Sequence, residues 1–238
     1  TSIGEYAFAG SSALTSVQIP AGVTKIEDYA FANCSALPAI TLPVGVTEIE
    51  KGVFLNCSSL RSVTLPQGMQ KVGDGAFANC TSLPSITLPL GLREIEKGAF
   101  SGCTSLASVS FPAAGLTDID EGAFYGCTAL KAATLPLGLR EIDKNAFWGC
   151  TSLTNVSIPA SVTEIKSGAF GGCTGLRSVT VGWTVPPMPR YPIFPSVPVS
   201  NVQLNVPRGT ESTYRSMPVW NEFLKIGTVA NAEVDGRQ

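Results

Sequence analysis

The stretch C-T-S-L-P-S-I-T-L-P-L-G-L-R-E-I-E-K-G-A-F-S-G, from Cys80 to Gly102, carries the pattern that decides the fold. The same pattern recurs along most of the chain with a period of 23 residues, lengthened once to 24. Phenylalanine marks the period, at Phe8, Phe31, Phe54, Phe77, Phe100, Phe124, Phe147 and Phe170. A fixed period of this length predicts a solenoid, in which each coil buries its apolar side only by stacking on its neighbours.

Each unit contains two segments that predict strands. In the first, such as Val63-Thr64-Leu65, apolar and polar residues alternate and a proline follows, which is typical of a short strand with one face inward. Equivalent strands of successive coils, about 4.8 Å apart, form a parallel sheet. A column of Ile and Val from Ile26 to Ile165 predicts a second, shorter parallel sheet. Gly or Asn always precedes the cysteine position, which predicts a left-handed residue closing a short helical turn.

Composition narrows the classes of function. The chain has 238 residues, of which 44% are hydrophobic, and its mean hydropathy is +0.23, so it supports a buried core. It has no histidine, which excludes Ser-His-Asp and Cys-His catalysis and every His-ligated metal site. The net charge of −2 without long basic runs argues against nucleic acid as a partner. The apolar runs are too short to predict a transmembrane segment.

The pattern C-x-x-L-x-x-[IV]-x-L-P-x-G-[LV]-x-x-I-x-x-x-A-F resembles the BspA-like, or Treponema-type, leucine-rich repeat. The departures are Ser11 for Cys, Ala133 for Val or Ile, and Phe111 for Leu. The resemblance implies a leucine-rich repeat solenoid, mostly β and of the α/β-horseshoe class. This is a right-handed, curved stack of about eight coils with parallel sheets, short helical turns and a C-terminal cap. It also implies secreted or surface-anchored bacterial proteins, often linked to adhesion, and no catalytic residues.

We expect two regions. Residues 1–181 form the solenoid of eight repeats, the first one truncated, and residues 182–238 form a capping segment with a frayed tail from 228 onward. Residues 201–207 look like one more strand, and Thr210 is the expected N-cap of a following helix. The chain starts inside a repeat without a signal peptide, so we expect targeting and anchoring segments to have been trimmed from it.

Seven cysteines follow the Phe positions at a spacing of 23 or 24 residues. An odd count excludes complete internal pairing, and the parallel direction of their side chains does not suit a disulfide. Metal clusters usually need closer pairs such as C-x-x-C. We therefore interpret the cysteines as small buried core residues.

The outward positions of the longer strands carry mostly hydroxyl side chains. Thr64, Thr87, Ser110 and Thr134 belong to one such column, and a neighbouring column is rich in serine. Together they predict a flat, nearly uncharged face that binds a ligand on the concave side. Ice binding is a remoter reading, and a solvated sheet face with ordinary β-propensity remains an alternative.

Charged residues border the Ile and Val column. One column, from Asp28 and Lys51 to Glu121 and Lys144, alternates in sign, so we expect ion pairs between adjacent coils. Beside the Ile positions, carboxylates face outward on successive coils. They are Glu94, Glu96, Asp118, Asp120, Glu141 and Asp143, with Glu164 beyond. Three readings stay open: calcium binding, neutralisation by Arg93 and Arg140, or a solvated acidic face.

Two aromatic residues follow the repeat Phe on adjacent coils, Tyr125 and Trp148. We expect them to stack as an exposed aromatic step that binds a sugar face or a protein hot spot. Local packing of a wide turn is the alternative.

These features favour a non-enzymatic recognition or adhesion module, outside the cell or at its surface, that binds a host extracellular protein or glycan. A structural spacer within a larger surface protein is the alternative, and an enzyme is the least favoured class. We expect no cofactor, with calcium as the one candidate.

Overall fold

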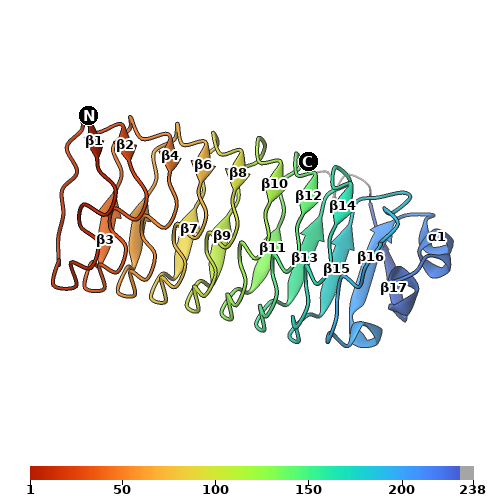
Figure 1. Ribbon diagram of the computed structural model, residues 1–238. Helices are drawn as coiled ribbons and strands as arrows, with labels where there is room; N and C mark the ends of the chain where they lie inside the picture. The colour runs from red at the N-terminus through yellow and green to blue at the C-terminus, as the bar shows by residue number, and fades with distance from the viewer. Residues whose placement is uncertain (231–238) are drawn as a thin grey trace.

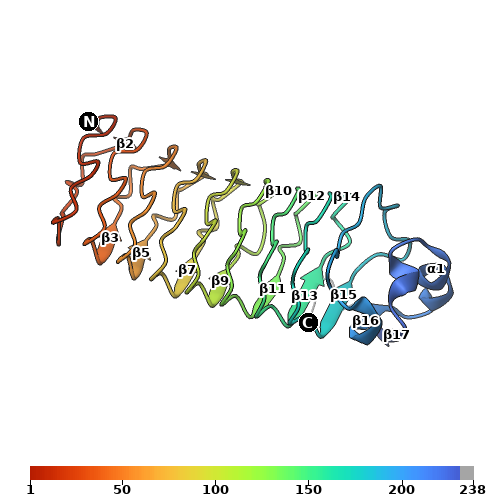
Figure 2. The same cartoon turned by 60° about the horizontal axis from the view of Figure 1, so that its bottom comes forward.

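Residues 1–230, which the computed structural model describes, wind into coils that stack in sequence order. Figure 1 shows the N-terminal coil at one end of the row and α1 at the other. Each repeat from Cys34 to Lys166 supplies one longer and one shorter strand, and in both views these run as two separate series along the stack (Figures 1 and 2). Where strands of successive coils pair, they do so in parallel without a shift in register. The predicted leucine-rich repeat solenoid is therefore confirmed.

The longer strands lie at the positions predicted from the alternating pattern. They are β3 (Ala39–Thr41), β5 (Ser62–Thr64), β7 (Ser85–Thr87), β9 (Ser108–Ser110), β11 (Ala132–Thr134), β13 (Asn155–Ile158) and β15 (Ser178–Val181). They form three successive sheet segments, β3-β5, β7-β9 and one that begins with β11-β13-β15. In each three-residue strand the middle residue points into the core and its neighbours point to solvent, as in β7, where Ile86 is buried between Ser85 and Thr87.

The shorter strands contain the Ile and Val column. They are β1 (Ser2–Ile3), β2 (Lys25–Ile26), β4 (Glu48–Ile49), β6 (Lys71–Val72), β8 (Glu94–Ile95), β10 (Asp118–Ile119), β12 (Glu141–Ile142) and β14 (Glu164–Ile165). β1 pairs with β2, and the others form one six-stranded parallel sheet from β4 to β14. In the six-stranded sheet a charged residue precedes the buried Ile or Val of every strand, so this sheet presents a charged outer edge.

The turn around each Phe is closed as predicted, by a residue with positive φ. The angles run from 58° at Asn56 to 75° at Gly10 and Gly149. A second left-handed column lies two residues before the Phe and was not predicted, although most of its members are glycine. It comprises Tyr6, Tyr29, Gly52, Gly75, Gly98, Gly122, Asn145 and Gly168.

The helical turns expected in the repeats are wrong in detail. With two left-handed residues per turn, a continuous helix is excluded. Alternate amides instead bond within the turn and to the next coil. The N–H of Ala78 donates to the carbonyl of Gly75 at 3.0 Å, and the N–H of Phe77 to Ala99 of the following coil at 2.8 Å. Within the described residues, the one α-helix is α1 (Glu211–Ser216) in the cap.

The core is a ladder of stacked phenylalanine rings. Phe77 is buried, with its ring centroid 5.3 Å from those of Phe54 and Phe100. All seven cysteines are free and buried beside the ladder, as expected. Each thiol donates to the carbonyl of the Phe in the preceding coil, as Cys103 does to Phe77 at 3.1 Å. The thiols are therefore satisfied donors as well as packing groups.

The stack continues beyond residue 181, where we placed its boundary. Phe194 extends the ring ladder, 5.7 Å from Phe170, and two further strands pair in parallel onto β15, namely β16 (Gln203–Pro207) and β17 (Lys225–Val229). The segment 182–229 thus adds two irregular turns. Its remaining elements are η1 (Val199–Asn201), α1 and η2 (Trp220–Glu222).

The cap closes the core with aromatic side chains. Tyr214, Trp220 and Phe223 are buried over the end of the ladder, and Phe194 packs edge-on against both Trp220 and Phe223. Thr210 is at the N-cap position of α1, but its hydroxyl donates to Pro207 and does not cap the helix. Residues 228 and 229, which we expected to be frayed, belong to β17. Residue 230 follows this strand without regular structure, and residues 231–238 of the predicted tail lie outside the described residues.

Candidate functional site

The outer face of the longer strands presents the predicted hydroxyl columns. Thr64, Thr87, Ser110 and Thr134 are exposed at the last position of successive longer strands, and pairing of β7 with β9 holds Thr87 and Ser110 in register. Within the described part of the chain their hydroxyls have no hydrogen-bond partner, whereas threonines on the turns bond to the preceding coil, as Thr154 does to the Lys131 carbonyl at 3.0 Å. This face therefore offers free donors and acceptors on a rigid backbone.

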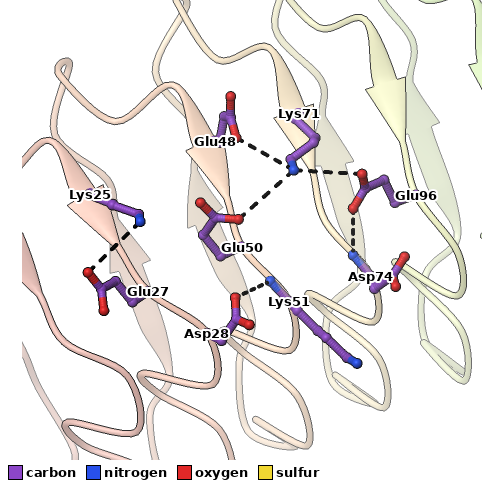
Figure 3. Close-up of polar contacts among 9 residues, drawn as sticks. All are labelled: Lys25, Glu27, Asp28, Glu48, Glu50, Lys51, Lys71, Asp74 and Glu96. Atoms are coloured by element: carbon purple, nitrogen blue, oxygen red, sulfur yellow. Dashed lines mark hydrogen bonds and ion pairs between the residues drawn. The ribbon is translucent and has the colours of Figure 1, made fainter.

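The shorter strands place a lysine among carboxylates at their outer edge. The Lys71 ammonium lies 3.5 Å from Glu48, 3.9 Å from Glu50 and 3.6 Å from Glu96, so one cation bridges three coils (Figure 3). Partial burial favours its neutral form, but the three carboxylates outweigh burial and raise the pKa of Lys71. In the same region Glu96 also accepts the backbone N–H of Asp74 at 3.1 Å.

Lys166 forms similar ion pairs at the other end of this edge. It contacts Glu141 and lies 2.9 Å from Asp143, and hydrogen bonds to these two carboxylates raise its pKa. Burial would raise the pKa of Asp143, but the Lys144 backbone N–H and Lys166 lower it. Asp120 lies between the two lysines. Burial first, and then Asp143, Asp118, Glu96 and Glu141, raise the pKa of Asp120 to about 6.

The structure corrects the prediction that Arg93 and Arg140 neutralise the carboxylates of this edge. Within the described residues, the ion pairs to these carboxylates come from Lys71 and Lys166, and none comes from Arg93 or Arg140. The alternating column forms an ion pair at Lys97 and Glu121, 3.0 Å apart. Asp28 accepts the backbone N–H of Lys51 at 3.2 Å, so the regular series of side-chain pairs is not formed.

The acidic side chains do not converge on a common point. Over residues 1–230, no group of three or more His, Cys, Asp or Glu side chains is placed to hold a metal ion. The calcium site predicted at Glu94, Glu96, Asp118, Asp120, Glu141 and Asp143 therefore has no support from the geometry.

Tyr125 and Trp148 lie on adjacent coils but do not stack on each other. The described aromatic contacts join Phe124 to Phe147 in the core and do not include this pair. The Trp148 ring instead covers the backbone of the following coil, where a Cβ on Gly171 would overlap it and one on Gly168 would lie 3.0 Å away. Tyr125 remains exposed at 46%. The predicted continuous step is thus two separate aromatic positions.

An asparagine ladder was missed by the sequence reasoning. The side chains of the left-handed Asn33, Asn56 and Asn79 bond along the stack: the Asn56 amide nitrogen donates to the Asn33 amide oxygen, and that of Asn79 to Asn56, both at 2.9 Å. Their recurrence every 23 residues was the available signal. The ladder ends where Gly102 replaces asparagine, and the Asn79 amide oxygen occupies the space of the missing side chain.

These features define a parallel-sheet β-solenoid with a capped C-terminal end. A family model for the BspA type leucine rich repeat region matches in six copies, over residues 1–115 and 71–192. The chain therefore belongs to the BspA-type leucine-rich repeat family. No helix among the described residues has the length and apolar character needed to cross a membrane.

Solved structures of bacterial leucine-rich repeat proteins share the fold. A leucine-rich repeat protein from Bacteroides ovatus is 28% identical with a TM-score of 0.68, over 96% of this chain and 64% of that one. The T. pallidum leucine-rich repeat protein is 35% identical with a TM-score of 0.58, over 66% of this chain and 72% of that one. The chain thus spans less than two thirds of the B. ovatus protein. No curated protein sequence matches it.

Proposed function

We propose that this chain is a non-enzymatic recognition module of a secreted or surface protein and binds a protein or glycan through the face of its longer strands. Membership of the BspA-type family supports the location and the scaffold role. The hydroxyl face carries the proposal, because Thr64, Thr87, Ser110 and Thr134 are exposed on successive coils and, within the described residues, their hydroxyls make no internal hydrogen bonds. A host extracellular protein or glycan is the proposed class of partner.

The physical reasoning rests on preorganisation. Parallel pairing fixes the strands, so the hydroxyls of Thr64, Thr87, Ser110 and Thr134 need no ordering of the backbone when a ligand binds. A nearly uncharged face adapts to sugars and to polar protein surfaces through direct or water-mediated hydrogen bonds. Tyr125 and Trp148 supply a second, aromatic candidate contact on the turn, independent of this face.

A binding screen against immobilised extracellular-matrix proteins, mucins and a glycan array tests the proposal. Each saturable ligand is then measured with Thr87→Lys and with Thr104→Lys, which places the same charge on an exposed turn off the sheet. We expect Thr87→Lys to weaken binding at least about tenfold, because a lysine there must be desolvated against the ligand. Thr104→Lys should bind as the unmodified chain does.

Trp148→Ala and Tyr125→Ala test the aromatic positions in the same assay. If folded protein binds nothing, or if no substitution on either surface alters binding, the structural spacer becomes the better description. The rigid ring ladder and the continuous backbone pairing are compatible with that role.

A further inference from the structure

The sheet of shorter strands ends at β14 with unpaired backbone carbonyls. Inside the sheet, the carbonyls of each coil accept N–H groups of the next. The N–H of Thr163 donates to Arg140 at 2.8 Å, and the N–H of Lys166 to Ile142 at 2.9 Å. The equivalent carbonyls of β14, those of Thr163 and Ile165, accept no backbone N–H within the described residues. Two acceptors therefore remain free on one edge, spaced as in every interior coil.

The next turn of the chain passes this edge without pairing to it. The Gly168 N–H donates to Pro192 at 2.8 Å as Asn145 donates to Ser167, which places Pro192 level with Ser167 and residues 189–190 level with β14. Pro187 and Pro189 have no N–H and restrict the backbone on both sides of Met188. Pro189 therefore cannot donate to β14, and no backbone N–H of residues 187–191 donates to the carbonyls of Thr163 or Ile165.

A cleft of about 290 Å³ lies between the two segments. Thr163, Glu164 and Ile165 line one side, and Pro187, Met188 and Tyr191 belong to the other. Met188 and Tyr191 are 63% and 56% exposed, so they form an apolar wall open to solvent. The cleft combines main-chain acceptors with apolar side chains, as sites that add a peptide strand to a sheet edge do.

We infer that the β14 edge is a docking site for an extended peptide segment of another protein, which adds to the sheet as a further short strand. The partner supplies two backbone N–H groups to the carbonyls of Thr163 and Ile165 and packs a side chain against Met188 and Tyr191. An extended peptide is the fitting partner because the acceptors repeat the spacing at which each coil receives its neighbour. The site is separate from the hydroxyl face, so the result of this test does not depend on whether the hydroxyl face binds a ligand.

The test uses a capped synthetic peptide that copies residues 138–145, G-L-R-E-I-D-K-N. In the protein this segment donates the N–H of Arg140 to Thr117 and of Asp143 to Ile119, so it already has the required geometry. Its binding to the isotope-labelled full chain is followed by amide NMR shifts. We expect saturable shifts at residues 163–166 and 188–191. A matched peptide, N-methylated at the position copying Asp143, lacks one donor and should bind about 3- to 10-fold more weakly.

Two exposed substitutions locate the site. Tyr191→Ala should weaken binding of the unmethylated peptide severalfold, whereas Leu90→Ala, which truncates another exposed apolar side chain, should not. Equal affinity for the two peptides, shifts confined to other regions, or no shift at millimolar peptide would overturn the inference. Amide exchange provides a further readout, since bound peptide should slow exchange along β14 and the methylated peptide should not.

Discussion

Replacing Phe77 by alanine tests whether the ring ladder holds the stack together. Phe77 is fully buried and stacks on both sides, 5.3 Å from Phe54 at 13° and 5.3 Å from Phe100 at 6°. Removing a buried Phe side chain costs about 3–5 kcal/mol through lost transfer energy and the cavity left behind. Each lost aromatic pair adds about 0.5–1.5 kcal/mol. We therefore expect the free energy of unfolding to fall by at least about 4 kcal/mol.

Phe8→Ala is the matched control, because Phe8 belongs to the same column but is 37% exposed and stacks on Phe31 alone. Its cost should be about half or less, since less area is buried and one stacking partner is lost. Phe77→Leu keeps most of the volume and should cost about 1–2 kcal/mol. Urea unfolding followed by far-ultraviolet circular dichroism measures all three. Equal costs for Phe77→Ala and Phe8→Ala, or a Phe77→Ala cost below about 1 kcal/mol, would refute the reasoning.

Three further predictions concern the charged edge and the cysteines. Because the folded-state pKa of Asp120 is raised to about 6, its contribution to stability is lost as pH rises through that value. Asp120→Asn should therefore be more stable than the unmodified chain at pH 7.5, with the difference vanishing below about pH 4 in thermal unfolding. Millimolar calcium should leave the melting temperature unchanged, because no described group of acidic side chains is placed to hold a metal. A melting temperature that rises with calcium concentration would instead support the calcium site. Burial raises the pKa of Cys103 to about 12, so its thiol should resist alkylation in the native chain and react once urea exposes it, and rapid native labelling would contradict its placement.

The repeat pattern was sufficient to predict the coils because each position meets the same environment in every turn. Phe77, Ile95 and Cys103 are core residues, and Asn79 and Gly102 have left-handed backbones, as their columns predicted. The prediction of a helical turn failed because the second left-handed position, at Gly75 and Gly98, was not recognised. Phe194 and β16 continue the stack into the segment expected to cap it, with an altered spacing that a fixed period does not detect.

The candidate sites were less predictable because they depend on side-chain direction. Hydroxyl exposure follows from strand alternation, and the sequence alone placed Thr87 correctly. The partners of the acidic residues do not follow from alternation. Lys71 forms ion pairs with Glu48, Glu50 and Glu96 of neighbouring coils. Which carboxylates it reaches depends on side-chain length and rotamer. The Trp148 ring turns toward Gly171 because the small residues of the following coil leave room there.

The amino-acid sequence by itself determined the solenoid, its inward columns and its hydroxyl face, since a strict 23-residue period leaves one way to bury Phe, Cys and Leu together. Only the tertiary structure decided where the pairing of the shorter strands stops. Within the described residues, the carbonyls of Thr163 and Ile165 accept no backbone N–H, although the segment with Pro187 and Pro189 lies across the cleft from them. Whether a strand of one coil is paired depends on residues more than 20 positions further along the chain, which lie beside it in the next coil. The pattern within a single repeat does not specify those residues.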